Sequence, residues 1–246
     1  MKIPPLHPWP QSVPEATRLQ EELRAQLLPG RLRGMPRTVA GAIVDFDKGD
    51  DRLYTAVVVV DSSSFEVVEV ATRTTVATFP YLPGYLSFRE IPPLVDAFSG
   101  LTHAPDLVVV NRHGHAHPRR IGMACHLGLW LQVPVLGVCP QLLMGEPPRV
   151  PKEPGSSSPL VDENNGELVG MAVRTRLGAP PVYVSVGRGM TLPEAAALTL
   201  ALCRGRRMPE PLRLAQREAA RLRGSVRNLA LDPEIAALVR NKGARS

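Results

Sequence analysis

The chain has 246 residues, of which 44% are hydrophobic and 21% charged, a composition that excludes a disordered protein and is typical of a folded globular one. Its formal net charge of +6 favours polyanions such as nucleic acid as partners. Three cysteines without a CxxC spacing exclude a thiolate zinc site and a disulfide framework, and they indicate a reducing cytoplasm. No signal peptide and no run of about 18 apolar residues is present, so we expect a cytoplasmic protein with no membrane partner.

The first predicted helix is capped by Ser12 and has Pro14 in its first turn. Three leucines spaced four residues apart form its apolar face, and the Pro29-Gly30 pair ends it. Three segments rich in valine and threonine then follow, joined by short polar links. This pattern predicts an antiparallel meander of three strands, over Thr38–Asp47, Leu53–Asp61 and Glu66–Thr75.

The rest of the chain alternates predicted helices and strands. Helices are predicted over Pro92–Ser99, Ile121–Gln132, Leu192–Cys203 and Pro211–Arg223. Strands are predicted over Asp106–Asn111, Val135–Cys139, Glu167–Thr175 and Val182–Val186, the last two at the edge of the sheet. Glu146–Asn165 is rich in Pro, Gly and Ser and predicts a surface loop. We therefore predict an α/β fold, a mixed sheet flanked by helices, in a single domain of residues 1–246.

The stretch PYLPGYLSFRE, from Pro80 to Glu90, combines prolines and a glycine with aromatic residues. Proline reduces the freedom of the chain and an aromatic ring stacks on a base, so a stiff aromatic turn is suited to wedging between bases. A rigid surface turn is the alternative interpretation.

The stretch from Asn111 to Gly128 follows a predicted buried strand, and α/β sheets place their sites at such strand ends. It contains four histidines and three arginines. His113, His115 and His117 alternate, but no fourth soft ligand is nearby, which disfavours zinc.

These stretches, together with His7-Pro8-Trp9 and RMPEPLRLA, resemble the endonuclease V family of deoxyinosine 3′-endonucleases along nearly the whole chain. The resemblance implies an RNase H-like fold and magnesium-dependent cleavage of one phosphodiester bond beside a deaminated base. The family's wedge and base pocket correspond here to Tyr81, Leu82, Pro83, Leu86, Gly114 and His117.

The catalytic positions of the family are only partly filled in this chain. Its first Asp falls on Ile43 or, aligned on the downstream strands, on Asp45, and we favour Asp45. The family's Glu is kept as Glu90, and its second Asp is replaced by Asn111. Its Lys position is Pro140 and its His position is Arg188. Asn111 keeps a carbonyl ligand but loses a negative charge, and the resemblance places two further positive charges, Arg112 and Arg188, at the metal position.

Three functional readings remain open. The first is a pseudoenzyme of this DNA repair family that binds single-stranded or distorted DNA or RNA. Its nuclease activity would be lost or strongly reduced. It would have no certain cofactor, and metal binding at Asp45 and Glu90 would be weak or absent. The second is a recruited enzyme for a small anionic substrate, held by arginine forks, with a histidine as general acid or base. The third is an active Mg²⁺-dependent endonuclease that uses Asp45 and Glu90. The candidate catalytic residues are Asp45, Glu90, Asn111 and His117, and the candidate substrate-binding residues are Tyr81, Leu82, Pro83, Leu86, Arg112, His113, Gly114 and Arg188.

Overall fold

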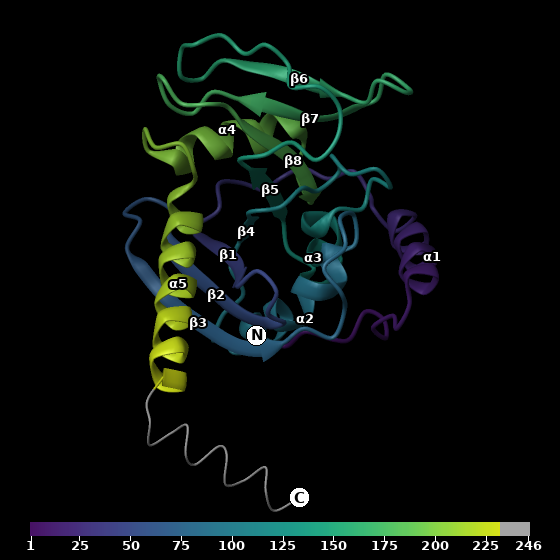
Figure 1. Cartoon of the computed structure of the whole chain (residues 1–246). Helices are drawn as coiled ribbons and strands as arrows, with labels where there is room; N and C mark the ends of the chain where they lie inside the picture. The colour runs from purple at the N-terminus through teal and green to yellow at the C-terminus, as the bar shows by residue number, and fades with distance from the viewer. Residues whose placement is uncertain (232–246) are drawn as a thin grey trace, which may run out of the picture.

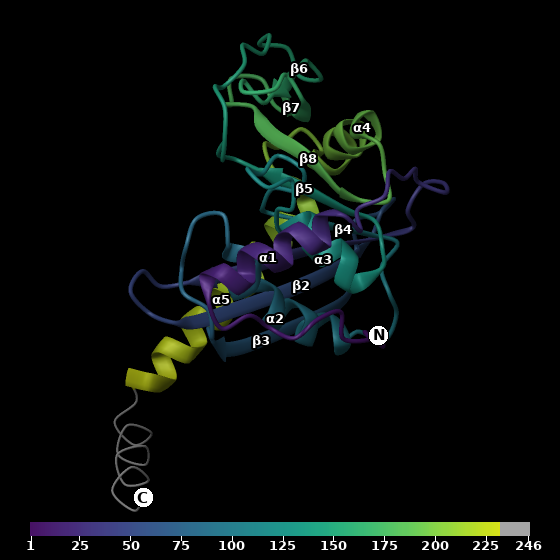
Figure 2. The same cartoon turned by 90° about the vertical axis from the view of Figure 1, so that its right-hand side faces the viewer.

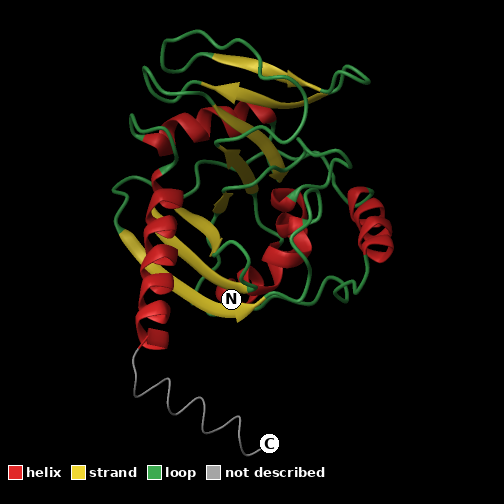
Figure 3. Ribbon diagram, viewed as in Figure 1, coloured by secondary structure: helices red, strands yellow, loops and turns green. Residues whose placement is uncertain are grey.

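One eight-stranded sheet organises the computed structural model, which describes residues 1–231, with side chains as far as Arg227 (Figures 1 and 3). The predicted domain of residues 1–246 extends further, and residues 232–246 lie outside the described part. The strands are β1 (Thr38–Phe46), β2 (Arg52–Asp61), β3 (Val67–Val76), β4 (Leu107–Val110), β5 (Val135–Cys139), β6 (Ser157–Val161), β7 (Leu168–Val173) and β8 (Val182–Arg188). The helices are α1 (Val13–Arg24), α2 (Leu86–Ser99), α3 (Met123–Leu131), α4 (Leu192–Cys203) and α5 (Glu210–Leu231).

The sheet is mixed, with the strand order β3-β2-β1-β4-β5-β8-β7-β6. The predicted meander is confirmed, because β2 pairs antiparallel with both β1 and β3. β1, β4 and β5 run parallel to one another, so their carboxyl ends meet at one edge of the sheet. Residues that follow these strands are therefore brought together, as expected for an α/β site.

Helices cover both faces of the sheet. α5 runs across β1, β2 and β3 and packs its apolar side on Ile43 and Ala56 (Figure 1). α2 and α3 cover the opposite face, and α1 lies outside α3, where Leu23 contacts Ile121 (Figure 2). Among the helices of the described residues, none is long and apolar enough to cross a membrane.

Most predicted elements are confirmed, but α2 begins six residues earlier than predicted, at Leu86 instead of Pro92. Pro92 and Pro93 lie inside the helix, although proline was interpreted as its first residue. The earlier start turns Phe88 and Ile91 into the core, where both are buried. Burial of this face offsets the backbone hydrogen bonds that the prolines cannot donate.

The prediction that the strands around 167–175 and 182–186 lie at the edge of the sheet is wrong. β8 lies between β5 and β7, and β7 lies between β8 and β6. The edge is β6, inside the segment 146–165 that was predicted to be a loop. Pro159 suits this position, because an edge strand tolerates a residue that has no N–H to donate. α5 also extends beyond the predicted Arg223, to Leu231.

Candidate functional site

A pocket of about 320 Å³ lies at the carboxyl ends of β4 and β5, and we call it the base pocket. Six residues predicted from the sequence line it: Tyr81, Pro83, Leu86, Arg112, His113 and His117. The sequence analysis missed most of its apolar wall, which is formed by Ile121, Met123, Cys139, Leu142 and Leu143. Ile121 and Met123 lie inside the Asn111–Gly128 stretch, whereas no motif pointed to Cys139, Leu142 and Leu143, which only their position at the end of β5 and after it could have suggested.

The aromatic turn before α2 forms one side of this pocket. Tyr81 is 54% exposed, and its ring centroid lies 5.5 Å from that of Phe46. The carbonyl oxygen of Gly84 accepts hydrogen bonds from the side chains of Gln20, His117 and Arg119, at 2.9, 3.0 and 2.9 Å. Three donors on one carbonyl hold the turn in place and leave the tyrosine ring exposed beside the pocket.

Two predicted pocket residues do not line it. Leu82 packs into a separate apolar cluster with Phe79 and Phe88. Gly114 lies behind the pocket wall, where its N–H donates to Ser185 Oγ at 2.8 Å. A methyl group at Gly114 would overlap the carbonyl group of Val186, so the loop after β4 crosses β8 only because this residue has no side chain.

The two histidines of the pocket are neutral at pH 7. Burial lowers the pKa of His113 and of His117 to about 4. His117 donates from Nε2 to Gly84 and accepts from the Arg119 N–H at Nδ1, so both ring nitrogens are engaged. His113 donates from Nε2 to the carbonyl oxygen of Gln141, at 2.9 Å, and its buried Nδ1 has no partner among the described residues. His113 Nδ1 is therefore a free acceptor.

Glu90 is fully buried at the inner side of the pocket and pairs with an arginine. Arg112 Nη2 donates to Glu90 Oε1 at 2.7 Å, while Arg112 Nη1 donates to the carbonyl oxygen of Asn111 at 2.8 Å. Burial opposes the charge of Arg112, but the Glu90 carboxylate outweighs it and raises the pKa of the guanidinium. The carboxylate thus already has a permanent cationic partner.

Ile43, inside β1, lies beside Asn111, which directly follows β4, because Ala42 pairs with Val110 in parallel register. Both line a cavity of about 360 Å³ under α5, which we call the strand-end cavity. Asp45 is not among its lining residues, and Arg223 Nη1 of α5 lies 3.2 Å from its carboxylate. Of the two candidates for the first acidic position, Ile43 is the one beside Asn111.

Arg188 lies at the opposite end of the sheet, so its predicted place in the site is wrong. β8 runs antiparallel to β5, and Arg188 pairs with Val135, the first residue of β5. Its guanidinium donates to Gln132 Oε1 at 2.8 Å. A match of sequence blocks does not say in which direction a strand runs in the sheet, and the direction of β8 is what places Arg188 away from the site. Pro140 does lie on the site's side, directly after β5.

α5 contributes residues that the sequence analysis did not assign to the site. Arg213, Gln216 and Arg217 line the strand-end cavity with Ile43 and Asn111. The sequence feature that could have pointed to them is the RMPEPLRLA block, which contains Arg213 and ends directly before Gln216. Further along, Arg223 and Arg227 pair with Asp45 and Asp47, so this part of the basic helix is bound to the sheet.

The residues present do not fit a magnesium site. Mg²⁺ prefers several oxygen ligands with carboxylates among them. Within residues 1–231 no three His, Cys, Asp or Glu side chains form a group that could hold a metal. Glu90 is paired with Arg112, Asn111 is an amide, and Ile43 is apolar.

Comparison with known proteins gives the family. The sequence model of endonuclease V matches residues 19–217. The chain belongs to the endonuclease V family. Endonuclease V of Roseiflexus sp. is 44% identical over 210 residues, covering 85% of this chain and 92% of its own length. The crystal structure of endonuclease V from Streptomyces avermitilis is 37% identical with a TM-score of 0.81, covering 89% and 96% of the two chains.

A third endonuclease V, from Ciona intestinalis, has been solved in complex with a 24mer DNA that contains an inosine. It is 22% identical, with a TM-score of 0.77, and the match covers 87% of this chain and 98% of that one. The predicted fold is confirmed by these endonuclease V structures, and it is RNase H-like.

Proposed function

We propose that this endonuclease V family member binds single-stranded or distorted nucleic acid around a flipped base and has lost most or all metal-dependent strand cleavage. One observation carries the proposal: an open base pocket lies directly beside a Glu90 carboxylate that is paired with Arg112. The pocket supports binding, and the ion pair argues against metal-assisted hydrolysis.

The base pocket suits a flipped purine. Its volume is about 320 Å³, its inner wall is apolar, and Tyr81 stands exposed beside it as a stacking surface. The solved relative from Ciona intestinalis holds DNA that contains inosine, which makes hypoxanthine the first base to test. His113 lines the pocket, but its Nδ1 is buried, so the support for base binding comes from the volume of the pocket, its apolar wall and the exposed Tyr81 ring.

The proposed loss of cleavage rests on the lack of free carboxylates that could hold a metal ion. A metal-assisted hydrolase uses carboxylates to hold the ion that activates water and stabilises the charge of the transition state. Here Ile43 and Asn111 occupy the strand ends where carboxylates would be needed, and Glu90 is neutralised. Arg112 also lines the base pocket, where its partly exposed guanidinium can donate a hydrogen bond to the bound strand while it stays paired with Glu90. Binding should therefore not require a divalent ion.

The experiment is binding of a labelled strand that carries one deoxyinosine, with Mg²⁺ and with a chelator. Wild type should bind equally in both. Arg112→Gly should bind about tenfold more weakly with chelator, because it loses one charged contact, and Mg²⁺ should restore part of the affinity once Glu90 is free. Arg176→Gly, which removes an exposed arginine that lines none of these pockets, is the control for net charge. Wild-type binding that disappears with chelator would contradict the proposal.

Two other functions are less well supported. A recruited enzyme for a small anion would need a histidine that exchanges protons near pH 7, but both pocket histidines have a pKa of about 4 and His117 has both nitrogens engaged. An active Mg²⁺-dependent nuclease would need Asp45 and Glu90 together, but each pairs with an arginine. A proton-transfer activity with a pH optimum near 7, or efficient cutting in Mg²⁺, would favour these alternatives.

A further inference from the structure

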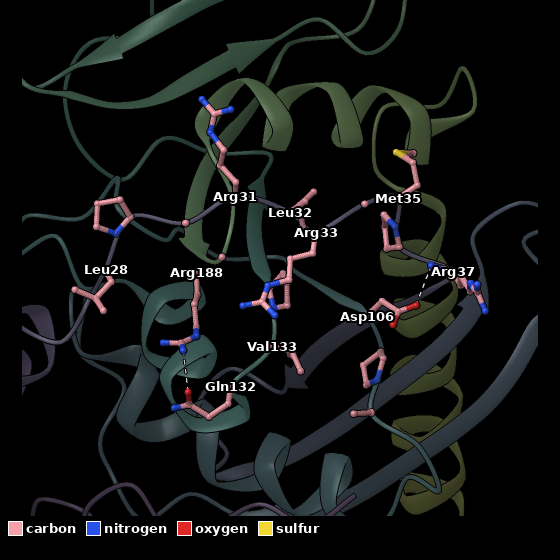
Figure 4. A pocket seen from close by; sticks show the side chains of 18 residues that line it. Leu28, Arg31, Leu32, Arg33, Met35, Arg37, Asp106, Gln132, Val133 and Arg188 are labelled. Atoms are coloured by element: carbon pink, nitrogen blue, oxygen red, sulfur yellow. Dashed lines mark hydrogen bonds between the residues drawn. The ribbon is translucent and has the colours of Figure 1, made fainter.

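A third cavity, of about 950 Å³, lies at the end of the sheet opposite the base pocket. Its floor is formed by Val133 and Pro134, which directly precede β5, and by Gly189 in the turn after β8. Its wall is the loop Leu28–Arg37, which joins α1 to β1 (Figure 4). We call this cavity the arginine groove, because Arg31, Arg33, Arg37 and Arg188 line it.

The loop that forms the groove is fixed at both ends. Gly30 packs directly on Gly189, and a methyl group at Gly30 would lie 2.8 Å from Gly189 Cα. At the other end, Ser62 Oγ donates to the carbonyl oxygen of Pro36 at 2.6 Å. Between them Leu32 packs against the core. The shape of the groove is therefore set by packing and hydrogen bonds, with arginines at alternate positions beside Leu32.

The charge of the groove is not balanced within it. Asp106 is its only acidic lining residue in the described chain, and Asp106 Oδ2 already accepts from the backbone N–H groups of Arg37 and Thr38, at 2.8 and 3.0 Å. Arg33 and Arg37 make no salt bridge with any described residue. Arg33 and Arg188 point to the same side of the loop, whereas Arg31 points away (Figure 4).

We propose that the arginine groove is a binding site for phosphate groups, separate from the base pocket. Guanidinium groups match phosphate through paired hydrogen bonds, and a bound polyanion would relieve the repulsion among the arginines. The groove has about three times the volume of the base pocket, 950 against 320 Å³, so it has room for more than one phosphate. The phosphates belong either to a distal part of a bound strand or to a free polyphosphate.

The test compares Arg33→Ala/Arg37→Ala with a matched double variant, Arg18→Ala/Arg24→Ala, which removes two exposed arginines of α1 that line none of the three pockets. The first arm titrates inorganic pyrophosphate and follows the melting temperature. The second arm measures strand affinity against salt concentration, for a long strand and for one short enough to fill only the base pocket.

If the phosphates belong to a bound strand, the groove variant should bind the long strand with a weaker salt dependence. The slope of log affinity against log salt concentration should fall by about 0.7 for each lost contact, and the slope for the short strand should not change. A free polyphosphate source predicts that pyrophosphate binds the groove variant about tenfold more weakly than wild type, with no change for either strand. Either result supports the site. Groove and control variants that behave alike in both arms would overturn it. The pyrophosphate arm needs no base recognition, so its result is independent of the function proposed for the base pocket.

Discussion

The base pocket and the strand-end cavity are neighbouring regions at the same edge of the sheet, but they differ in the kind of residue that builds them. The base pocket has the stiff aromatic turn, the fixed Gly84 carbonyl and an apolar wall. The strand-end cavity has an isoleucine and an amide, with the nearby Glu90 held by Arg112. Loops and a helix start form the first region, whereas β1, the end of β4 and α5 form the second.

The largest expected effect comes from restoring carboxylates at the strand ends. Ile43→Asp/Asn111→Asp/Arg112→Gly places two acidic groups beside a released Glu90, and a bound metal contributes several kcal/mol to phosphodiester hydrolysis. We expect the triple variant to cut a deoxyinosine strand in Mn²⁺ on the order of a thousandfold faster than wild type. Arg188→His has no part in this design, because Arg188 lies at the other end of the sheet.

Arg112→Gly alone is the control for this design, and a time course on a labelled strand is the measurement. A folded triple variant that binds Mn²⁺ and the strand but does not cut it would contradict the idea that the missing carboxylates alone separate the two regions. It would mean that the path of the strand past the cavity has also changed.

A large loss of stability is expected when the wall behind the base pocket is disturbed. Gly114→Ala places a methyl group on the carbonyl of Val186 and should cost about 3 kcal/mol of unfolding free energy. Gly224→Ala is the matched control, since no atom lies within 4 Å of its added methyl group in α5, and it should stabilise by about 0.5–1 kcal/mol. Urea unfolding measures both, and equal stability of the two variants would show that the crossing over β8 is not tight.

Tyr81→Ala tests whether the base pocket binds nucleic acid independently of the strand-end cavity. If the exposed ring stacks on a base, the variant should lose about 1–3 kcal/mol of affinity for a deoxyinosine strand with its stability unchanged. Tyr81→Phe keeps the ring and should bind like wild type. Fluorescence anisotropy at one fixed salt concentration is sufficient, and equal affinity of the alanine variant would remove Tyr81 from the interface.

The last comparison is the pH dependence of stability contributed by His117. Burial lowers its pKa from 6.5 to about 4 in the folded protein. Between these values the unfolded chain binds more protons, so the stability is complete above pH 6.5 and decreases as the pH falls towards 4. His113, His126 and His7 also have lowered pKa values and act in the same direction. The test is therefore a difference: His117→Gln should flatten this part of the urea-unfolding profile, and a profile parallel to wild type would contradict the assignment.

Local signals predicted the fold well wherever they were sufficient. α4 was predicted with its observed bounds, and in the structure Thr191 and Glu194 form a capping box at its start. β8 was misplaced to the edge because its position depends on pairing with β5, Val138 with Val184, and no local pattern records that pairing. α2 was predicted to begin at Pro92, whereas it begins at Leu86, because burial of Phe88 and Ile91 decides its first turn.

The site was predictable as a set of motifs but not as an arrangement. The motifs gave most of the residues around the base pocket. The choice between Ile43 and Asp45 required the register of β1 on β4, which is a tertiary fact. The ion pair of Arg112 with Glu90 joins residues 22 positions apart and depends on where α2 begins. Arg188 shows the limit most clearly, since a block match placed it in the site and strand direction places it at the far end.

The most direct test of the account is a cleavage time course of the wild-type protein in Mg²⁺ and in Mn²⁺ on a strand that carries one deoxyinosine. Endonuclease V of Streptomyces avermitilis, 37% identical to this chain, serves as the comparison enzyme in the same buffer. The account predicts that the strand is bound but that no product forms above the protein-free control, in a buffer that is accepted only if the comparison enzyme cuts the strand in it. Cutting by the wild type at a similar rate would contradict it, and would show that Glu90 serves catalysis despite its pairing with Arg112.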